Sequence, residues 1–412
     1  MTDQYLENYL DLIMRYGKSY LASGGSTSRL EESLWDFGQK MDIETEVFAT
    51  SSGIFVTCSE NGKANKITRM GRIYHGENDM AELIRLENLL EEMRASRKAM
   101  EKTRHKILEV KSFTYSRLVF FTALFLFGVA TSLPSYGSWG AAIGSGLLVM
   151  LVFWMSGAFA KKLGLTGVFT EFLGCCFIFL VAGFCAVEFH VPARAFAEGA
   201  LILMVPGLTI TNAISELANH NFISGTSKMM RGILTLLAMG TAFLFARDVA
   251  GLVGDVNLVS PVKDLFEGSF VLKVIGMIGS ASAVGILFNV PARLIPFSVI
   301  TAVASWTLLQ SVQGLGFYVL GSFLPALSVG FFSMAFSRIF KVPSQVFSVP
   351  GILSLVPGML ALSSFFQFSG FGEEQSSIGM RVMIIASSIV FGLFTARIPF
   401  ILLAPKRQNF SE

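Results

Sequence analysis

Two short stretches decide how most of this chain folds: Met204-Val205-Pro206-Gly207-Leu208 and Leu355-Val356-Pro357-Gly358-Met359. They start 151 residues apart, and each lies near the middle of an apolar run long enough to cross a membrane. Proline removes a backbone donor and clashes with the preceding turn, while glycine lets the helix open. Both stretches are therefore predicted to break a membrane helix near the bilayer centre and to free backbone groups there.

Apolar runs of similar length recur on both sides of these stretches. The chain has 412 residues, of which 52% are apolar and 15% charged, and its mean hydropathy of +0.60 is typical of a membrane protein. A hydrocarbon core of ~30 Å needs about 20 apolar residues per helix. Ten spans are predicted on this basis: 118–134, 138–160, 168–188, 195–215, 229–251, 269–288, 294–310, 314–335, 345–367 and 378–403.

The two Pro-Gly stretches occupy the same place, the fourth span, in two sets of five. Because five is odd, the second set must cross the membrane in the opposite sense, as in an inverted-topology repeat. We therefore predict an α-helical polytopic membrane fold with two five-helix inverted repeats, at residues 113–252 and 253–412. The alternative is a chance coincidence of Val-Pro-Gly at matched positions.

The first 116 residues differ in composition, because they hold 34 of the 61 charged residues. Hydrophobic periodicity predicts a small cytoplasmic α+β domain over residues 1–112. Its expected elements are helices at 3–22 and 28–41, strands at 45–49, 53–58 and 66–70 with a turn at Asn61-Gly62, and a long charged helix at 78–112. That last helix could pair with a second copy of itself, which would make a homo-oligomer.

Gly24-Gly25-Ser26-Thr27-Ser28 precedes the second predicted helix. Ser28 with Glu31 three residues later is typical of a capping box. The same stretch offers backbone N–H groups and hydroxyls to an anion, as helix N-termini often do. A bound ligand at this turn is therefore the alternative to a plain helix cap.

The distribution of lysine and arginine predicts the orientation. With the N-terminus inside, the inner loops and C-terminal tail hold nine of these residues and the outer loops five, together with eight acidic residues. The start of the chain is acidic and amphipathic and lacks the pattern of a cleavable signal. We expect a multi-pass protein of the cytoplasmic membrane with both termini in the cytoplasm.

Several function classes lack their residues. The net charge of +3 forms no basic face, so nucleic acid is not expected as a partner. The four cysteines form no Cys-x-x-Cys and have no histidine at ligand spacing, so neither a metal nor a cofactor is predicted. The motifs of ATP-driven pumps and zinc peptidases are also missing, and no nucleophile has a histidine base beside it. The chain is therefore not predicted to be an enzyme.

Polar side chains follow both predicted breaks. Together with the freed backbone groups, they could bind the ammonium and carboxylate of a small zwitterion. The alternative is a kinked packing helix whose hydroxyls bond back to their own carbonyls. The predicted substrate-binding residues are Pro206, Gly207, Thr209, Thr211, Asn212, Pro357, Gly358 and Ser363.

Glu171 lies about one turn into the third span. Ionisable groups at such depth are costly and usually functional, so this carboxylate is predicted to carry a coupling proton. The alternative is an interfacial carboxylate that pairs with Lys161 or Lys162. Three other ionisable residues lie closer to span ends and are expected at the interface: Glu198, Glu216 and Arg397.

The order of four motifs resembles the threonine/serine exporter family, in the form that fuses both halves in one chain. These motifs are Leu21-Ala22-Ser23-Gly24-Gly25-Ser26-Thr27-Ser28-Arg29-Leu30-Glu31-Glu32, Val205-Pro206-Gly207-Leu208-Thr209-Ile210-Thr211-Asn212-Ala213-Ile214, Leu287-Phe288-Asn289-Val290-Pro291-Ala292-Arg293 and Val349-Pro350-Gly351-Ile352-Leu353-Ser354-Leu355-Val356-Pro357-Gly358. The resemblance implies ten membrane helices, a cytoplasmic N-terminal domain and proton-driven export of small amino acids. Split relatives are linked to succinate export, so the resemblance leaves the substrate open. Ser354 departs from the proline expected before the second Leu-Val-Pro-Gly.

The leading prediction is a secondary exporter that moves an amino acid or small dicarboxylate out and protons in, with lipid as its surroundings. One repeat would move against the other around a site near the two breaks. A membrane-embedded enzyme, a sensor that binds its ligand at the Gly-Gly-Ser-Thr turn, or a passive channel are the alternatives.

Overall fold

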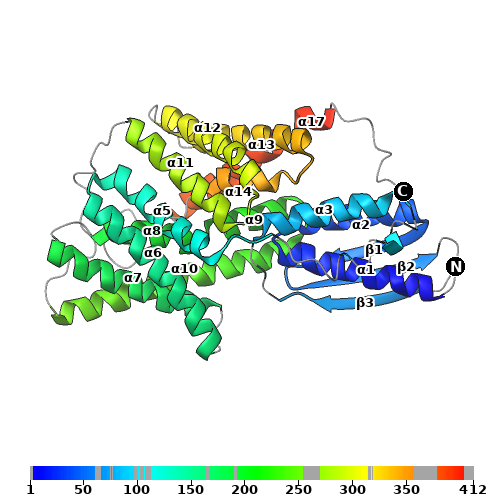
Figure 1. The fold of residues 1–412 in the computed structure, drawn as a ribbon, viewed down its shortest axis with the longest axis horizontal. Coiled ribbons are helices and arrows are strands. Elements are labelled where there is room, and N and C mark those ends of the chain that lie inside the picture. The colour runs from blue at the N-terminus through cyan, green and yellow to red at the C-terminus, as the bar shows by residue number, and fades with distance from the viewer. Residues whose placement is uncertain are drawn as a thin grey trace.

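The computed structural model describes residues 3–60, 66–74, 76, 78–96, 98, 100–102, 106, 113–163, 167–189, 193–253, 270–313, 317, 319–353, 355 and 378–402. The chain divides into a small α+β unit at one end of the long axis and a bundle of apolar helices at the other (Figure 1). We refer to residues Asp3–Arg94 as the N-terminal unit.

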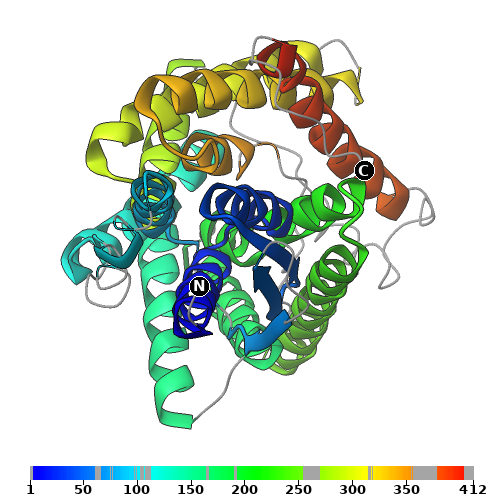
Figure 2. The same ribbon diagram turned by 90° about the vertical axis from the view of Figure 1, so that its right-hand side faces the viewer.

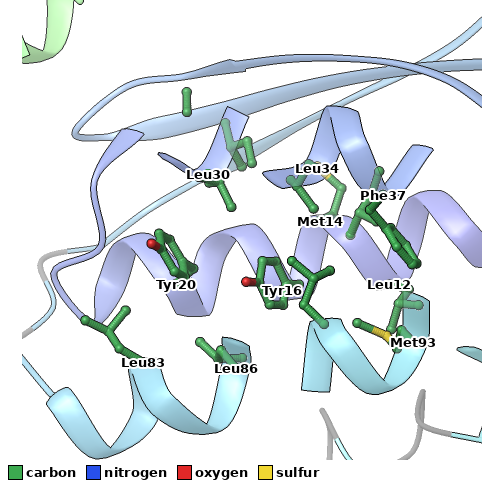
Figure 3. Packing of buried hydrophobic residues seen from close by; sticks show 14 of the residues in the cluster. Leu12, Met14, Tyr16, Tyr20, Leu30, Leu34, Phe37, Leu83, Leu86 and Met93 are labelled. Atoms are coloured by element: carbon green, nitrogen blue, oxygen red, sulfur yellow. The ribbon is translucent and has the colours of Figure 1, made fainter. Parts of the chain in front are cut away.

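The N-terminal unit packs three helices and a three-stranded antiparallel sheet of order β1-β2-β3. Its elements are α1 (Asp3–Ala22), α2 (Thr27–Met41), β1 (Ile43–Ala49), β2 (Gly53–Glu60), β3 (Lys66–Arg72) and α3 (Met80–Arg94). Buried side chains from α1, α2 and α3, among them Tyr16, Leu34 and Leu86, point toward one another (Figure 3). The predicted helices and strands of this unit are confirmed, except for the long last helix, while the Asn61-Gly62 turn lies outside the described residues.

Two local predictions were wrong. The helix expected at 78–112 is interrupted: α3 ends at Arg94, and described residues are helical again at 98, 100–102 and 106, because no large apolar side chain continues the buried stripe between Met93 and Met100. Ser28 does not cap α2, whose N-cap is Ser26, and Glu31 instead accepts a hydrogen bond from the Ala49 N–H at 2.7 Å. Glu31 therefore ties α2 to the end of β1 and closes no capping box.

The bundle consists of long apolar helices. They are α5 (Arg117–Tyr136), α6 (Trp139–Leu163), α7 (Val168–Phe189), α8 (Ala193–Met204), α9 (Gly207–Ala218), α10 (Phe222–Val253), α11 (Phe270–Leu287), α12 (Ile295–Gln313) after a 3-10 turn at Ala292–Leu294, α13 (Leu320–Phe340), α14 (Gln345–Leu353), α16 (Ile378–Thr395) and α17 (Ile398–Leu402). Within the described residues, nine spans are long and apolar enough to cross a membrane. One of them joins α8 to α9. Most of the predicted span 345–367 lies outside the described residues, so the count of ten stays a prediction.

Corresponding helices of the two predicted repeats make the same kinds of contact. In the first set, α5 packs on α6 and α8, and α7 packs on α10. In the second set, α11 packs on α12 and α14, and α13 packs on α16. The first helices of the two sets, α5 and α11, also pack on each other. Seen from the side of the N-terminal unit, the helices surround that unit in projection (Figure 2).

Candidate functional site

The predicted break in the fourth span is present. α8 ends at Met204 and α9 begins at Gly207, and the Gly207 N–H turns back to the Val205 carbonyl at 2.8 Å. Pro206 takes φ −78° and ψ 38°, outside the helical region. Proline has no N–H to continue the helix, so the chain bends at this residue.

The break leaves the start of α9 without a cap. Pro206 stands at the N-cap position and makes no side-chain hydrogen bond. Within the described residues, the N–H groups of Leu208 and Thr209 find no backbone acceptor outside α9, whereas Ile210 bonds to the Pro206 carbonyl. The first N–H groups of a helix carry the positive end of its dipole, and a carboxylate is a suitable partner for them.

The polar residues after the break differ in their surroundings. Thr211 is 2% exposed, and its hydroxyl donates to the Gly207 carbonyl at 3.1 Å. This bond supports the packing alternative for Thr211. Thr209 and Asn212 are half-buried, and their side chains make no hydrogen bond to the part of the chain that the structure describes. Their polar groups are therefore the ones open to a ligand.

The described chain just before the second Pro-Gly stretch lies close to the first break. Pro357, Gly358 and Ser363 lie outside the described residues, so their predicted role stays a prediction. The helix that leads to them, α14, packs on α9. Leu208, directly after the first break, packs against the apolar cluster that contains Ile352 and Leu355. Leu355, the described first residue of the second stretch, thus belongs to a cluster that contacts the first break, on the side where α14 packs on α9.

Glu171 lies in the first turn of α7 and is half-buried. Its carboxylate accepts a hydrogen bond of 2.6 Å from the Thr235 hydroxyl of α10. One turn further along α7, the Cys175 thiol lies 4.0 Å from the Met204 sulfur, directly before the break. A helical turn rises about 5.4 Å, so Glu171 is close in depth to the break but not part of it.

Glu216 is buried at the end of α9, and its expected place at the membrane interface stays a prediction. It is 4% exposed, and its carboxylate is bound from several sides. The hydroxyl of Thr27 donates to it at 2.6 Å, the ammonium of Lys228 at 2.8 Å and the amide of Asn221 at 3.1 Å. A buried carboxylate is stable when its oxygens are paired in this way. Of the other two expected interfacial residues, Glu198 is half-buried and Arg397 is exposed.

These contacts bring the Gly24–Ser28 turn to the membrane helices. The Thr27 N–H points at Glu216 at 3.4 Å, and the Ser28 hydroxyl accepts from the Asn221 amide at 2.7 Å. The anion at the start of α2 is therefore the chain's own carboxylate. The sequence offered a weak signal for this pairing, an acidic residue inside an apolar run with Lys228 twelve residues later.

The described residues contain no group of three or more metal-binding side chains. Cys58, Cys175 and Cys176 are buried free thiols and Cys185 is half-buried. In the N-terminal unit, burial raises the pKa of the Cys58 thiol to about 12, against a weaker opposing effect of its hydrogen bond to Thr45. This thiol has the properties of a core residue rather than of a nucleophile.

Two family models match the chain. Residues 11–249 match the family described as "Putative threonine/serine exporter", and residues 273–398 match "Threonine/Serine exporter, ThrE". The chain belongs to the threonine/serine exporter family. The match confirms the resemblance expected from the four motifs and makes the chain a multi-pass membrane transporter for a small molecule. No curated protein and no solved structure matches the chain.

The family places the candidate residues in a transporter. The break at Pro206 and Gly207, with Thr209 and Asn212, lies within the segment that the first model matches, and so does Glu171. The segment from Val349 to Gly358 lies within the second match. The break at Pro206 and the predicted break at Pro357 thus both lie in segments that match the exporter family.

Proposed function

We propose that this exporter is a secondary active transporter that moves small amino acids of the threonine/serine type out of the cell in exchange for protons. The observation that carries the proposal is the uncapped start of α9 at Pro206 and Gly207, in the middle of a membrane span of a threonine/serine exporter. The proposal places the N-terminal unit and both chain termini in the cytoplasm, since the basic residues favour that side.

The substrate's carboxylate would bind at the N–H groups of Leu208 and Thr209. These groups have no other described partner outside α9, and the helix dipole favours a negative charge there. The hydroxyl of Thr209 and the side-chain oxygen of Asn212 are available to the substrate's ammonium and hydroxyl. Half-broken helices serve transporters in this way, because freed backbone groups replace the solute's hydration.

Movement would occur between the two sets of helices. The matching contacts within each set and the packing of α5 on α11 support an internal repeat whose halves meet at these two helices and also where α9 packs on α14 and α16. The first break lies beside the second set of helices, since Leu208 packs against the cluster of Ile352 and Leu355. Rocking of one set against the other would expose the site to each side in turn.

Glu171 is the proposed proton carrier. Its carboxylate accepts a hydrogen bond from the Thr235 hydroxyl, and no cation lies at ion-pair distance among the side chains that the structure describes, which do not include those of Lys161 and Lys162. A carboxylate without a cation can take up a proton at less cost than a paired one. Its position about one turn from the contact of Cys175 with Met204 would let its protonation affect the packing around the break.

Efflux from proteoliposomes tests the proposed function. Vesicles preloaded with radiolabelled threonine, serine or succinate are compared with and without an imposed pH gradient. We expect gradient-dependent efflux of threonine or serine; efflux of succinate alone would assign the dicarboxylate alternative instead. Absence of efflux from folded, inserted protein would contradict the exporter proposal.

A pair of variants locates the site in the same assay. Asn212→Ala is expected to raise the KM for the amino acid at least about tenfold, because a buried hydrogen bond to a charged ligand contributes about 1.5–3 kcal/mol. Thr241→Val is the matched control, since the Thr241 hydroxyl is exposed on α10 and bonds back to the Leu237 carbonyl. Equal KM values for the two variants would remove Asn212 from the site.

A further inference from the structure

The N-terminal unit is attached to the corner between α9 and α10, the residues Glu216 to Lys228. Thr27 binds Glu216, Ser28 binds Asn221, and the Ser51 hydroxyl of the β1–β2 turn lies 2.9 Å from the Ser227 hydroxyl. Every one of these contacts joins polar groups. The corner is therefore a polar junction between the unit and the first set of helices.

A second attachment joins the same side of the molecule to the other set of helices. The Met80 N–H donates to the Phe288 carbonyl at 2.9 Å, and the Tyr115 hydroxyl, just before α5, donates to the Val290 carbonyl at 2.8 Å. The core of the N-terminal unit forms one continuous apolar cluster with buried residues of α14 and of the loop before α12. The buried members from the second set are Val290, Leu294, Val342, Val346, Phe347 and Val349.

The two attachments bridge the two sets of helices on one side. The polar junction holds the end of α9 and the start of α10, and the apolar junction holds the segment from α11 to α14. In Figure 2 the N-terminal unit lies in front of the helices, which surround it in projection. A unit bound to both sets cannot follow both when they move apart, so one junction must open whenever this side opens.

The chemistry of the two junctions decides which one opens. Separation of the apolar junction would expose buried side chains such as Phe347 to water, which is unfavourable in proportion to the apolar surface exposed. Separation of the polar junction exchanges its hydrogen bonds for hydrogen bonds to water, which replace most of their energy, and Glu216 keeps its ion pair with Lys228. The junction at Glu216 is therefore the weaker and more reversible of the two.

We propose that the N-terminal unit is the inner gate of the exporter, closed by the contacts of Glu216, Asn221 and Ser227 with Thr27, Ser28 and Ser51 and opened by separation at this corner. The gate rests on the proposed function for its place in the transport cycle. α9 carries the uncapped substrate-binding end at Gly207 and the gate contact at Glu216, nine residues later. Opening of the gate would thus free the far end of the same short helix that binds the substrate.

A reversible disulfide tests the gate. Ser51 and Ser227 are both replaced by cysteine, since their hydroxyl oxygens lie 2.9 Å apart and serine to cysteine changes little volume. Cys185 is replaced by alanine, while the other three native thiols are buried. Two readouts are taken before and after oxidation and again after reduction. The first is amino-acid efflux by the double variant. The second uses a protein that also carries Thr209→Cys and measures labelling at position 209 alone, assigned by peptide mapping, by a membrane-impermeant maleimide from the side of the N-terminal unit.

We expect oxidation to lower both efflux and Thr209→Cys labelling at least about tenfold, and reduction to restore both. The single variants Ser51→Cys and Ser227→Cys, treated alike, should keep both values. Unchanged labelling in the oxidised double variant would overturn the gate, and so would failure of the disulfide to form in folded protein. Labelling does not require a transported substrate, so a labelling response without any efflux would refute the proposed function and leave the gate supported.

Discussion

Glu171 and Glu216 are both carboxylates inside apolar helices, and their neighbours decide what each can do. Glu216 is 4% exposed and bound by Thr27, Asn221 and Lys228. Such a group is held ionised and in place, which suits a structural contact. Glu171 is half-buried, and its hydrogen bond comes from the neutral hydroxyl of Thr235. That difference is our reason for proposing Glu171, and not Glu216, as the proton carrier.

Glu171→Gln is expected to abolish the response of efflux to a pH gradient, because the amide keeps the size of the side chain but cannot take up a proton. Thr235→Val should lower gradient-driven efflux more moderately, by about two- to tenfold, since it removes only the 2.6 Å bond that positions the carboxylate. The measurement is efflux against imposed pH difference. A wild-type response of Glu171→Gln would exclude this residue as the proton carrier.

Glu31 supplies a pH-dependent prediction in the N-terminal unit. Burial raises the pKa of its carboxyl, the Ala49 N–H opposes the shift, and nearby Glu216 adds to it. A raised pKa in the folded state means that the protonated carboxyl favours folding. The stabilisation is complete below the pKa of the unfolded chain, about 4.3, and it is lost as the pH rises through the pKa of the folded protein. Glu31→Gln keeps an acceptor for Ala49, so its melting temperature should exceed that of the wild type at pH 7 and match it near pH 4.

Glu44 is the control for this titration, because its pKa is shifted the other way. The Ser59 hydroxyl and then the charge of Lys66 lower the pKa of this exposed carboxyl. Its stabilising contribution is therefore present above the unfolded pKa and is lost as the pH falls. Glu44→Gln should melt below the wild type at pH 7 and converge with it in acid. If the melting temperatures of Glu31→Gln and Glu44→Gln, each taken relative to the wild type, changed with pH in the same direction, the opposite pKa shifts of Glu31 and Glu44 would both be contradicted.

At the scale of elements, the broken span α8–α9 shows which features a sequence can predict. Pro206 and Gly207 made the break predictable, because proline cannot continue a helix's hydrogen bonds. The end of α3 at Arg94 was not predicted. The apolar pattern of Leu86, Leu90 and Met93 stops there, but the residues that follow include alanine, lysine and arginine, which are good helix formers. Local propensity alone did not indicate where packing ends.

Pro206→Ala is expected to join α8 and α9 and to lower export at least about tenfold, because the N–H groups at the start of α9 would then bond within a continuous helix. Pro325→Ala is the matched control, since Pro325 is also buried but lies inside the continuous helix α13. Efflux rates of the two variants, at equal amounts of inserted protein, provide the measurement. Equal rates would show that the break is not needed for transport.

At the scale of the whole molecule, the apolar runs predicted the spans well, while the docking of the N-terminal unit was not predictable. Most predicted spans agree with the described helices, because lipid requires about 20 apolar residues in a row. The contact of Thr27 with Glu216 joins residues 189 positions apart, and no local pattern encodes it. The first break was predicted correctly, its role as a substrate site stays a prediction, and Pro357, Gly358 and Ser363 lie outside the described part of the chain.

The joint between the two sets of helices supports the last prediction. α11 packs closely on α5 at Gly276, where an added Cβ would lie 2.6 Å from the Ala130 carbonyl oxygen and also meet Pro134. Because backbone cannot yield as a flexible side chain can, Gly276→Ala should force the helices apart at a cost of about 1–3 kcal/mol. We expect a lower melting temperature and slower efflux, since the two sets would no longer fit in both orientations.

Gly157→Ala in α6 is the control, because nothing lies within 4 Å of its added Cβ. If Gly276→Ala and Gly157→Ala had the same melting temperature and efflux rate, close packing of α11 on α5 would not be required for transport. The movement of one set against the other would then occur at a different contact between the two sets.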